Sequence, residues 1–313
     1  MKLIEKLTSV EKNFSIEITP PFKNKSISPF FRTIERFIPH NPAFVSITYH
    51  PLKTSCIQTE KKSFIIKKHA DHLGICAAVK YKYNVVVLPH FVCAGMNHVE
   101  VEDRLIDYAF LGIENLLVLR GDALRANEEF TPVDGGYAFA NELVFQLNEM
   151  RQALYLNKID DYPALDFCIG VAGYPEKHFQ ARDQQTDIDY LKRKIDSGAD
   201  FIITQLCYNL EQFIDWVNLC RRTGIKVPII PGFKPLTSMQ QILTLKQVYQ
   251  IKIPESIEKI INQASEKNRA WEIGIEHGAN FCRRLQDFGF PFLHFYTMGN
   301  GKDIEELVKR IKE

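Results

Sequence analysis

The stretch LLVLRGD, residues 116–122, decides the fold class. Residues 116–119 form a continuous apolar run, which is typical of a strand that is covered on both faces. The run continues without a break into Arg120, Gly121 and Asp122, so a strand built for the interior ends in two opposite charges around a glycine. We expect such an ending where a buried strand meets a ligand cavity, and Gly121 would let a flat ligand approach the backbone closely.

Seven further segments of the same kind occur along the chain. They are rich in Val, Ile and Phe, they end in polar or glycine residues, and stretches with helical periodicity lie between them. The eight predicted strands are SIEIT (15–19), AFVSITY (43–49), NVVVLPH (84–90), NLLVLRG (115–121), DFCIGVAGY (166–174), ADFIITQL (199–206), KVPIIPGF (226–233) and PFLHFYT (291–297).

Helical periodicity is clearest in residues 97–113, 210–224 and 253–268, where Pro254 suits a first-turn position. Residues 238–289 are long enough for two or three helices before the last strand. Eight strand–helix alternations without a linker or repeat predict a single (β/α)8 TIM barrel over residues 1–313. A doubly wound open sheet is the alternative, and the absence of GxGxxG after a strand weakens it.

Composition and charge restrict the function classes. The chain has 313 residues, of which 45% are hydrophobic and 25% charged, and its formal net charge is +1, so we expect no nucleic-acid or membrane partner. The N-terminus lacks the apolar stretch of a signal peptide, which predicts a cytoplasmic location. The seven scattered cysteines predict free thiols, and His69 and His72 lack a third ligand, so we expect no metal site.

Polar residues gather where the predicted strands end, which in a barrel is the rim that carries chemistry. Glu17 is the most informative, because a carboxylate between Ile16 and Ile18 must point into the barrel mouth or be desolvated. A second group lies in residues 187–200 and comprises Asp187, Tyr190 and Lys194 on one helix face, with Arg193 adjacent. An acid and a base on one face suit a nucleotide, and the alternative, which the spacing alone favours, is a solvated face with intrahelical ion pairs.

Taken together, these stretches resemble the catalytic domain of the methylenetetrahydrofolate reductases, which are flavin-dependent (β/α)8 barrels. The resemblance extends from about residue 14 to the last helix. It rests on SIEITPP (15–21), FVSITY (44–49), LPHFVC (88–93), LRGD (119–122), VAGYPEKH (171–178), LKRKIDSGADFIITQL (191–206), IIPGFKPL (229–236) and LHFYTM (293–298).

The resemblance implies FAD-dependent reduction of 5,10-methylenetetrahydrofolate to 5-methyltetrahydrofolate with NADH or NADPH as the electron donor, in one-carbon metabolism and methionine synthesis. It implies that Glu17 is the general acid, that Asp122 lies beside the flavin and binds the pterin, and that Gln205 and Tyr296 bind the folate. The positions implied to bind FAD are Thr48, Tyr49, His90, Arg120, Gly121, Asp122, Ala140, Tyr174, His178, Ala181, Asp187, Tyr190, Arg193 and Lys194.

A general acid must hold its proton near neutral pH, so we expect Ile16 and Ile18 to raise the pKa of Glu17. The chain departs from the family pattern at Met239, Tyr190 and Asn300, of which Asn300 stands where an arginine is common. Another flavin barrel dehydrogenase, or a flavin- or folate-binding subunit that needs a partner for electrons, remains an alternative. We also expect a homo-oligomer without a C-terminal regulatory domain.

Overall fold

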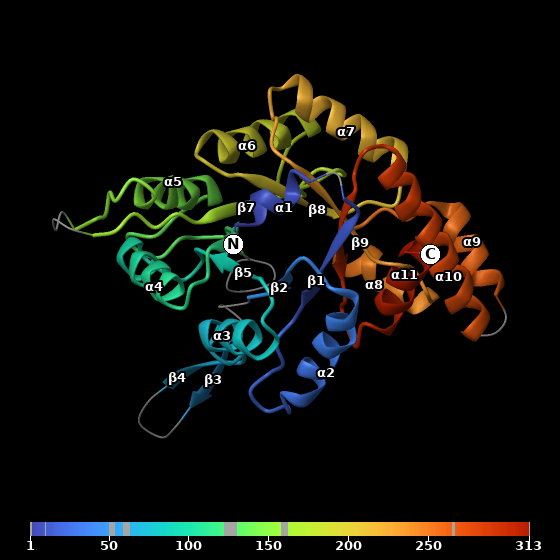
Figure 1. Ribbon diagram of the computed structural model, residues 1–313, viewed down its shortest axis with the longest axis horizontal. Coiled ribbons are helices and arrows are strands. Elements are labelled where there is room, and N and C mark those ends of the chain that lie inside the picture. Colours follow the sequence, from blue (N-terminus) through green and yellow to red (C-terminus); the bar gives the residue numbers. More distant parts are fainter. Residues whose placement is uncertain are drawn as a thin grey trace.

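Eight parallel strands close into a barrel, which confirms the predicted (β/α)8 architecture (Figure 1). The computed structural model describes residues 2–9, 11–49, 54–58, 63–121, 130–157, 162–264 and 267–312, with the backbone alone for 54–58, 63–67 and 267. In barrel order the strands are β1 (Asn13–Ile18), β10 (Phe292–Tyr296), β9 (Ile229–Phe233), β8 (Phe201–Leu206), β7 (Cys168–Gly173), β6 (Asn115–Leu119), β5 (Val87–Val92) and β2 (Val45–Ile47).

Helices surround the strands, as expected for this fold (Figure 1). They are α1 (Leu3–Leu7), α2 (Ser28–Phe37), α3 (His72–Tyr83), α4 (His98–Phe110), α5 (Ala140–Met150), α6 (Gln184–Asp196), α7 (Leu210–Arg222), α8 (Met239–Val248), α9 (Glu255–Gln263), α10 (Lys267–Asp287) and α11 (Lys302–Lys312), with a 3-10 turn at Ile38–His40. The segment 238–289 thus holds three helices.

Most strand and helix boundaries differ from the sequence prediction by one to three residues, and two of the differences have a clear local cause. The third barrel strand begins at Val87 rather than at residue 84, because Asn84 adopts a left-handed conformation (φ 48°) that ends α3. Pro254 is the N-cap of α9 and precedes the first turn instead of lying in it. A short antiparallel hairpin, β3 (Thr54–Gln58) with β4 (Ser63–Lys67), was missed, since neither strand carries a long apolar run or an Asn-Gly turn.

Side-chain alternation divides the residues of each barrel strand between two environments. Alternate residues of β1, namely Phe14, Ile16 and Ile18, belong to the large outer core that packs under the helices. The inward-facing residues of the other strands form a separate apolar cluster at the amino end of the barrel, made of Phe44, Leu88, Leu117, Cys168, Phe201, Ile203, Ile230 and Phe292. Leu3 and Leu7 of α1 join this cluster, so the N-terminal helix closes that end of the barrel.

Above this apolar layer, the inward-facing side chains become polar. Ser15, Ser46 and His294 are each fully buried, and His90 is 8% exposed. Because they come from adjacent strands β10, β1, β2 and β5, they converge in the half of the barrel nearest its carboxyl ends. The barrel interior is therefore apolar at one end and polar at the other.

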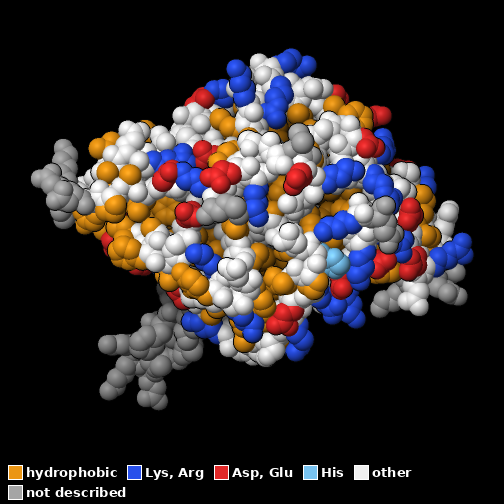
Figure 2. Space-filling view, in the orientation of Figure 1, with side chains coloured by type: hydrophobic (Ala, Val, Ile, Leu, Met, Phe, Trp, Pro, Cys, Tyr) orange, Lys and Arg blue, Asp and Glu red, His pale blue; other side chains and the backbone are white. Residues whose placement is uncertain are grey.

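The outer surface carries charges of both signs in an intermixed pattern, and Figure 2 shows this for one face. None of the described helices has the length and hydropathy that a membrane crossing requires. Among the described residues, no group of three or more His, Cys, Asp or Glu side chains could hold a metal ion. Six cysteines are free and buried, and the side chain of Cys56 lies outside the described residues.

Two glycine substitutions should change stability in opposite directions. A Cβ atom on Gly232 of β9 would lie 2.1 Å from the carbonyl oxygen of Thr204 and 2.6 Å from the ring of Tyr296, so Gly232→Ala should lower the free energy of unfolding by about 2 kcal/mol. At Gly74, inside α3, a Cβ would meet no described atom within 4 Å, so Gly74→Ala should raise it by about 0.5–1 kcal/mol. Urea unfolding of both variants measures these changes, and equal effects would contradict the packing at Gly232.

Candidate active site

Glu17 lies at the carboxyl end of β1 with its side chain inside the barrel mouth. Its Oε2 atom is 3.2 Å from Nε2 of His90 on β5 and 3.9 Å from Nε2 of His294 on β10. The Glu17 side chain is 16% exposed, whereas that of His294 is fully buried. A single carboxylate is therefore flanked by two imidazoles at the rim of the barrel, where barrel enzymes carry their chemistry.

The expected rise of the Glu17 pKa is wrong. Burial alone would raise the pKa, and it is the largest single effect, but the neighbouring imidazoles of His294 and His90 together outweigh it and lower the pKa to about 2. The apolar neighbours do not surround the carboxylate, because Ile16 and Ile18 point to the opposite face of the strand. In the free protein Glu17 is an ionised carboxylate at neutral pH.

Hydrogen bonds beneath the carboxylate orient the two imidazoles. The Ser46 hydroxyl donates to the carbonyl oxygen of Leu88 at 3.2 Å, which leaves its lone pairs facing Nε2 of His90 at 3.1 Å. Nε2 of His90 is therefore the donor, and it points toward both Ser46 and Glu17. On the other side, Nδ1 of His294 lies 2.7 Å from the Ser15 hydroxyl, and its Nε2 has no hydrogen-bond partner among the described residues.

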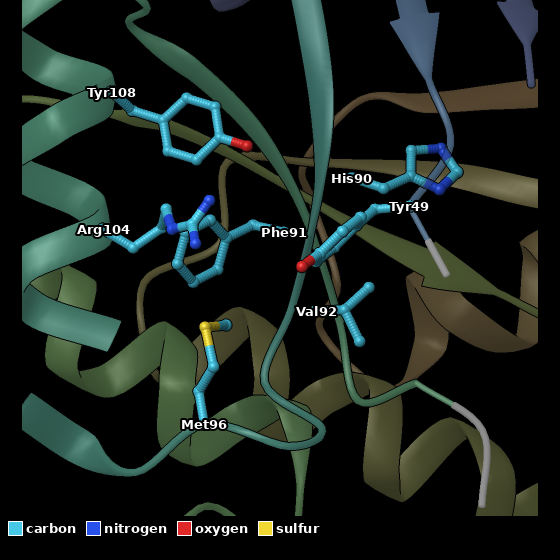
Figure 3. A pocket seen from close by; sticks show the side chains of 7 residues that line it. All are labelled: Tyr49, His90, Phe91, Val92, Met96, Arg104 and Tyr108. Atoms are coloured by element: carbon cyan, nitrogen blue, oxygen red, sulfur yellow. The ribbon is translucent and has the colours of Figure 1, made fainter. Parts of the chain in front are cut away.

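A small pocket adjoins His90 between β5 and helix α4 (Figure 3). Figure 3 shows the side chains of Tyr49, Arg104 and Met96 around this space, with His90 on its far side. The pocket is also lined by Phe91, Val92 and Tyr108. Arg104 is paired with Asp71, the N-cap of α3, at 3.3 Å. The pocket therefore places one cation, Arg104, and two phenols, those of Tyr49 and Tyr108, near the imidazole that contacts Glu17.

Tyr49 is held at this pocket by a buried histidine. Its ring stacks on the ring of His72 with a centroid distance of 4.8 Å and an interplanar angle of 28°. Nε2 of His72 lies 3.0 Å from the Ile47 carbonyl and must donate to it, so Nδ1 accepts from the hydroxyl of Tyr108 at 2.7 Å. Burial lowers the pKa of His72 to about 3, so this ring remains neutral.

The next strands carry a second group of the residues that sequence analysis assigned to a cofactor. Arg120, directly after β6, donates to the side-chain oxygen of Gln180 at 2.6 Å. Tyr174 follows β7, and its ring packs edge-on against His178 at a centroid distance of 4.7 Å. Ala181 is buried in the same loop, and Ala140 is the half-buried first residue of α5. These positions occupy adjacent strands on one half of the barrel rim.

Helix α6 turns two of its four candidate residues toward this half of the rim. Asp187 is 7% exposed and accepts a hydrogen bond from the backbone of His178, while Nζ of Lys194 donates to the carbonyl of Ala172 at 2.6 Å. Burial raises the pKa of Asp187 and lowers that of Lys194 to about 8. Tyr190 is 47% exposed and lies 5.5 Å from the guanidinium of Arg193, so only these two residues occupy a solvated face.

Two expectations about the LRGD motif have different outcomes. Gly121 has φ 93°, and a Cβ there would lie 2.4 Å from Val92 and 2.9 Å from Ala94 on the neighbouring strand's end. The chain's own packing thus requires a glycine at this position, and the close approach of a flat ligand to Gly121 stays a prediction. Asp122 lies outside the described residues, so its distance from Glu17 is not defined.

The two residues expected to bind the substrate belong to the rim of β8 and β10. Tyr296 is 7% exposed, and its hydroxyl donates to the carbonyl of Thr204 at 2.8 Å, so its polar atom is already used within the protein. Gln205 is the next residue after Thr204 and is half-buried. It lies on β8, near the carboxyl end of that strand.

Sequence analysis missed two residues of the barrel interior, His294, which approaches Glu17, and Ser15, which contacts His294. Ser15 and His294 each stand two positions before a residue that it did select, Glu17 and Tyr296 respectively. Polar residues at alternate positions of an apolar strand are the signal that would have found them, because alternate residues face the same side. Arg104, in contrast, lies on an amphipathic helix, where one more charge carries no such signal.

The structure is a closed parallel barrel with a carboxylate and two imidazoles at the carboxyl ends of its strands. These features define the class of α/β-barrel enzymes, which carry their active sites at this rim. Residues 2–312 match the family described as methylenetetrahydrofolate reductase, and the chain belongs to this family.

Several relatives of known name match almost the whole chain. It is 30% identical to "Methylenetetrahydrofolate reductase (NADH) 1" of Arabidopsis thaliana, with 96% of this chain and 49% of the relative aligned. It is 28% identical to "5,10-methylenetetrahydrofolate reductase" of Escherichia coli, with 93% and 87% aligned. A "Probable methylenetetrahydrofolate reductase (NADPH)" of Caenorhabditis elegans is 29% identical, with 98% and 43% aligned. The chain thus spans about half the length of its plant and animal relatives.

Solved structures support the fold. An uncharacterized protein from Clostridium thermocellum that binds two copies of 5-methyl-5,6,7,8-tetrahydrofolic acid superimposes with a TM-score of 0.58 at 16% identity, over 99% of this chain and 98% of that one. A 2,3-dimethylmalate lyase gives a TM-score of 0.53 at 8% identity, over 99% and 83%. At these identities the likeness concerns the barrel alone.

The low pKa of Glu17 predicts a particular acid sensitivity. Since this pKa lies below the ordinary glutamate value of 4.5, the ionised carboxylate stabilises the fold above about pH 4.5, and this stabilisation is lost as the pH falls toward 2. Its magnitude is about 3 kcal/mol at most. Glu17→Gln should therefore lose less stability than the wild type between pH 5 and pH 3, measured by urea unfolding. A carboxyl carbon resonance of Glu17 that titrates near 4.5 would contradict the assignment.

Proposed function

We propose that this chain binds FAD and reduces 5,10-methylenetetrahydrofolate to 5-methyltetrahydrofolate with electrons from NADH or NADPH. Membership of the methylenetetrahydrofolate reductase family supports the reaction class. The observation that carries the proposal within this chain is the contact of Glu17 with His90 and its approach to His294 at the barrel rim. A carboxylate that contacts solvent alone has no fixed group with which to exchange protons. A carboxylate between two imidazoles has such groups and therefore suits proton transfer.

The donor set on one half of the rim fits a flavin dinucleotide. Arg120 and Lys194 are cations that suit the diphosphate, and Asp187 is a carboxylate that suits a ribose hydroxyl. Asp187 is buried and Lys194 half-buried, and burial disfavours the charged form of each, so a polar ligand that contacts them would favour both charges. Tyr49 and His90 line the pocket next to this set. FAD bound there would supply the hydride chemistry, which no amino-acid side chain can provide.

Glu17 would then be the residue that protonates the substrate nitrogen released when the five-membered ring opens. In the free protein it is ionised, so it must take up a proton before or during substrate binding. A planar pterin over the mouth would remove the remaining 16% exposure of the side chain and raise its pKa, because burial is already the largest effect acting on it. As an imidazolium, His90 would donate its Nε2 proton across the 3.2 Å contact to the carboxylate and be left as the neutral ring.

The other proposed contacts follow from position at the same rim. Gln205, half-buried at the end of β8, would hydrogen-bond the folate, and Tyr296 would shape the cavity with its ring, since its hydroxyl is bonded to Thr204. Asp122 is proposed as the anionic neighbour of the pterin; a fixed negative charge at a developing cation is typically worth roughly 2–4 kcal/mol. The remaining cofactor positions, Thr48, Gly121, Ala140, Tyr174, His178, Ala181, Tyr190 and Arg193, are proposed to line FAD.

A flavin- or folate-binding subunit that receives electrons from another protein is the second candidate. Two departures from the family pattern favour it. Asn300 is exposed, and its side-chain oxygen accepts from the backbone of Lys302, so it does not replace the cation that is usual there. Met239 is half-buried at the start of α8 and presents no aromatic ring.

Anaerobic mixing separates these two candidates. We expect purified protein to bind FAD. Its flavin absorbance should be bleached by NADH or NADPH and restored by 5,10-methylenetetrahydrofolate. Bleaching by neither nucleotide, together with reoxidation after chemical reduction, would support the partner-dependent subunit. Protein that binds no flavin at all would contradict both.

Substitution of Glu17 tests the proton-donor role directly. Glu17→Gln should retain FAD and be reduced by pyridine nucleotide at the wild-type rate, because its side chain is not on the cofactor half of the rim. Reduction of 5,10-methylenetetrahydrofolate should fall by about 10²-fold or more, since an amide cannot supply the proton. Stopped-flow measurement of each half-reaction reports these rates, with Glu11→Gln on the exposed N-terminal segment as the control. Near-normal folate turnover in Glu17→Gln would contradict the role.

A further inference from the structure

A buried ion pair lies beside the candidate site, and the proposed chemistry does not use it. Lys234 directly follows β9 and is 4% exposed. Its Nζ atom lies 2.6 Å from Oδ2 of Asp303, in the first turn of α11, and donates to the carbonyl oxygen of Thr297 at 3.0 Å. A lysine this deeply buried needs such partners, because an unpaired ammonium is strongly destabilised away from water.

This pair is connected to the backbone of Glu17 through one residue. The amide nitrogen and the hydroxyl of Thr297 both donate to the carbonyl oxygen of Glu17, at 3.2 Å and 2.8 Å. Lys234, Thr297 and Glu17 therefore form a chain of hydrogen bonds across the rims of β9, β10 and β1, which are neighbours in the barrel. The backbone of Lys234 is itself fixed, since its carbonyl accepts from the hydroxyl of Tyr208 at 2.8 Å.

The same ammonium closes the β10–α11 loop, residues 297–301. It holds Thr297 at the start of this loop and Asp303 just after its end. Between these points the backbone is constrained, because Met298 has φ 43° and Gly301 has φ 72°. A Cβ on Gly301 would lie 2.8 Å from the ring of Phe37, so the loop also packs closely on α2. One side chain thus fixes the loop at both ends.

We propose that Lys234 and Asp303 are positioning residues for Glu17. They hold Thr297, and Thr297 fixes the end of β1, so that the Glu17 carboxylate remains at contact distance from His90. Neither residue needs to touch substrate or cofactor. The inference rests on the proposed function, because positioning of Glu17 affects turnover only if Glu17 is the proton donor.

A purely structural role for the pair makes a different prediction. Buried ion pairs can often be replaced by apolar residues of similar volume without loss of stability, whereas removal of one partner leaves an uncompensated charge. If the pair served stability alone, an apolar replacement that restores stability would also restore activity. If the pair positions Glu17, the apolar replacement should restore stability without restoring folate turnover, because an apolar pair cannot donate to Thr297.

The test compares Lys234→Met, Asp303→Leu and the double variant Lys234→Met/Asp303→Leu in the full-length holoprotein. The matched control is Lys246→Met/Glu258→Leu, which removes an exposed ion pair of 2.7 Å between α8 and α9. We expect each single variant to have a lower Tm and the double variant to regain the wild-type Tm. In the double variant, flavin reduction by pyridine nucleotide should be unchanged, while kcat for the folate half-reaction falls by about tenfold to a hundredfold with little change in KM.

Histidine NMR gives a readout that does not depend on turnover. Ring resonances of His90 and His294 report the position of the Glu17 carboxylate, so they should shift in the double variant and not in the control. A double variant that regains the Tm with wild-type folate turnover and unshifted histidine resonances would overturn the proposal, and so would one that does not regain the Tm. Wild-type protein that fails to react with folate would refute the proposed function instead, and the NMR comparison would still test the positioning of Glu17.

Discussion

The alternation of side chains along closed barrel strands is the constraint on which the rest of this structure depends. Each strand sends every second residue into a space shared by all eight strands, so the composition at those positions sets the character of the interior at each level. In this chain the interior near the amino ends of the strands is apolar and is covered by α1. The interior near the carboxyl ends holds Ser15, Ser46, His90 and His294. The same alternation places Ile16 and Ile18 under the helices, away from the carboxylate between them.

Two opposing effects act on that carboxylate. Removal from water favours the neutral acid, and nearby imidazoles favour the anion; in the free protein the imidazoles prevail. Because burial is the largest single effect and opposes the imidazoles, we propose that a further loss of solvent at the mouth raises the pKa of Glu17. A carboxylic acid in a purely apolar setting would have its proton already and would lack the partner from which to regain it after each turnover.

The strand order separates the proposed cofactor residues from the proposed substrate residues. Strands β2, β5, β6 and β7, with α6, carry most of the residues proposed to bind FAD, whereas β1, β8, β9 and β10 carry Glu17, Gln205, Lys234 and Tyr296. His90 faces both halves, since it lines the pocket with Tyr49 and contacts Glu17. A cofactor bound on one half and a substrate bound across the mouth would meet near this histidine. The ion pair of Lys234 and Asp303 belongs wholly to the second half.

The sequence by itself determined the fold class, the eight barrel strands and the family, because apolar runs, their spacing and the motifs at their ends are local properties of the chain. It also selected Glu17, Arg120, Asp187 and Lys194 from their settings in strands and on one helix face. Only the tertiary structure decided the ionisation of Glu17, the orientation of His90 by Ser46, and the contact of Lys234 with Asp303. These depend on atoms brought together by barrel closure from residues as far apart as 17 and 294, and a sequence pattern does not contain the distances that fix an electrostatic balance.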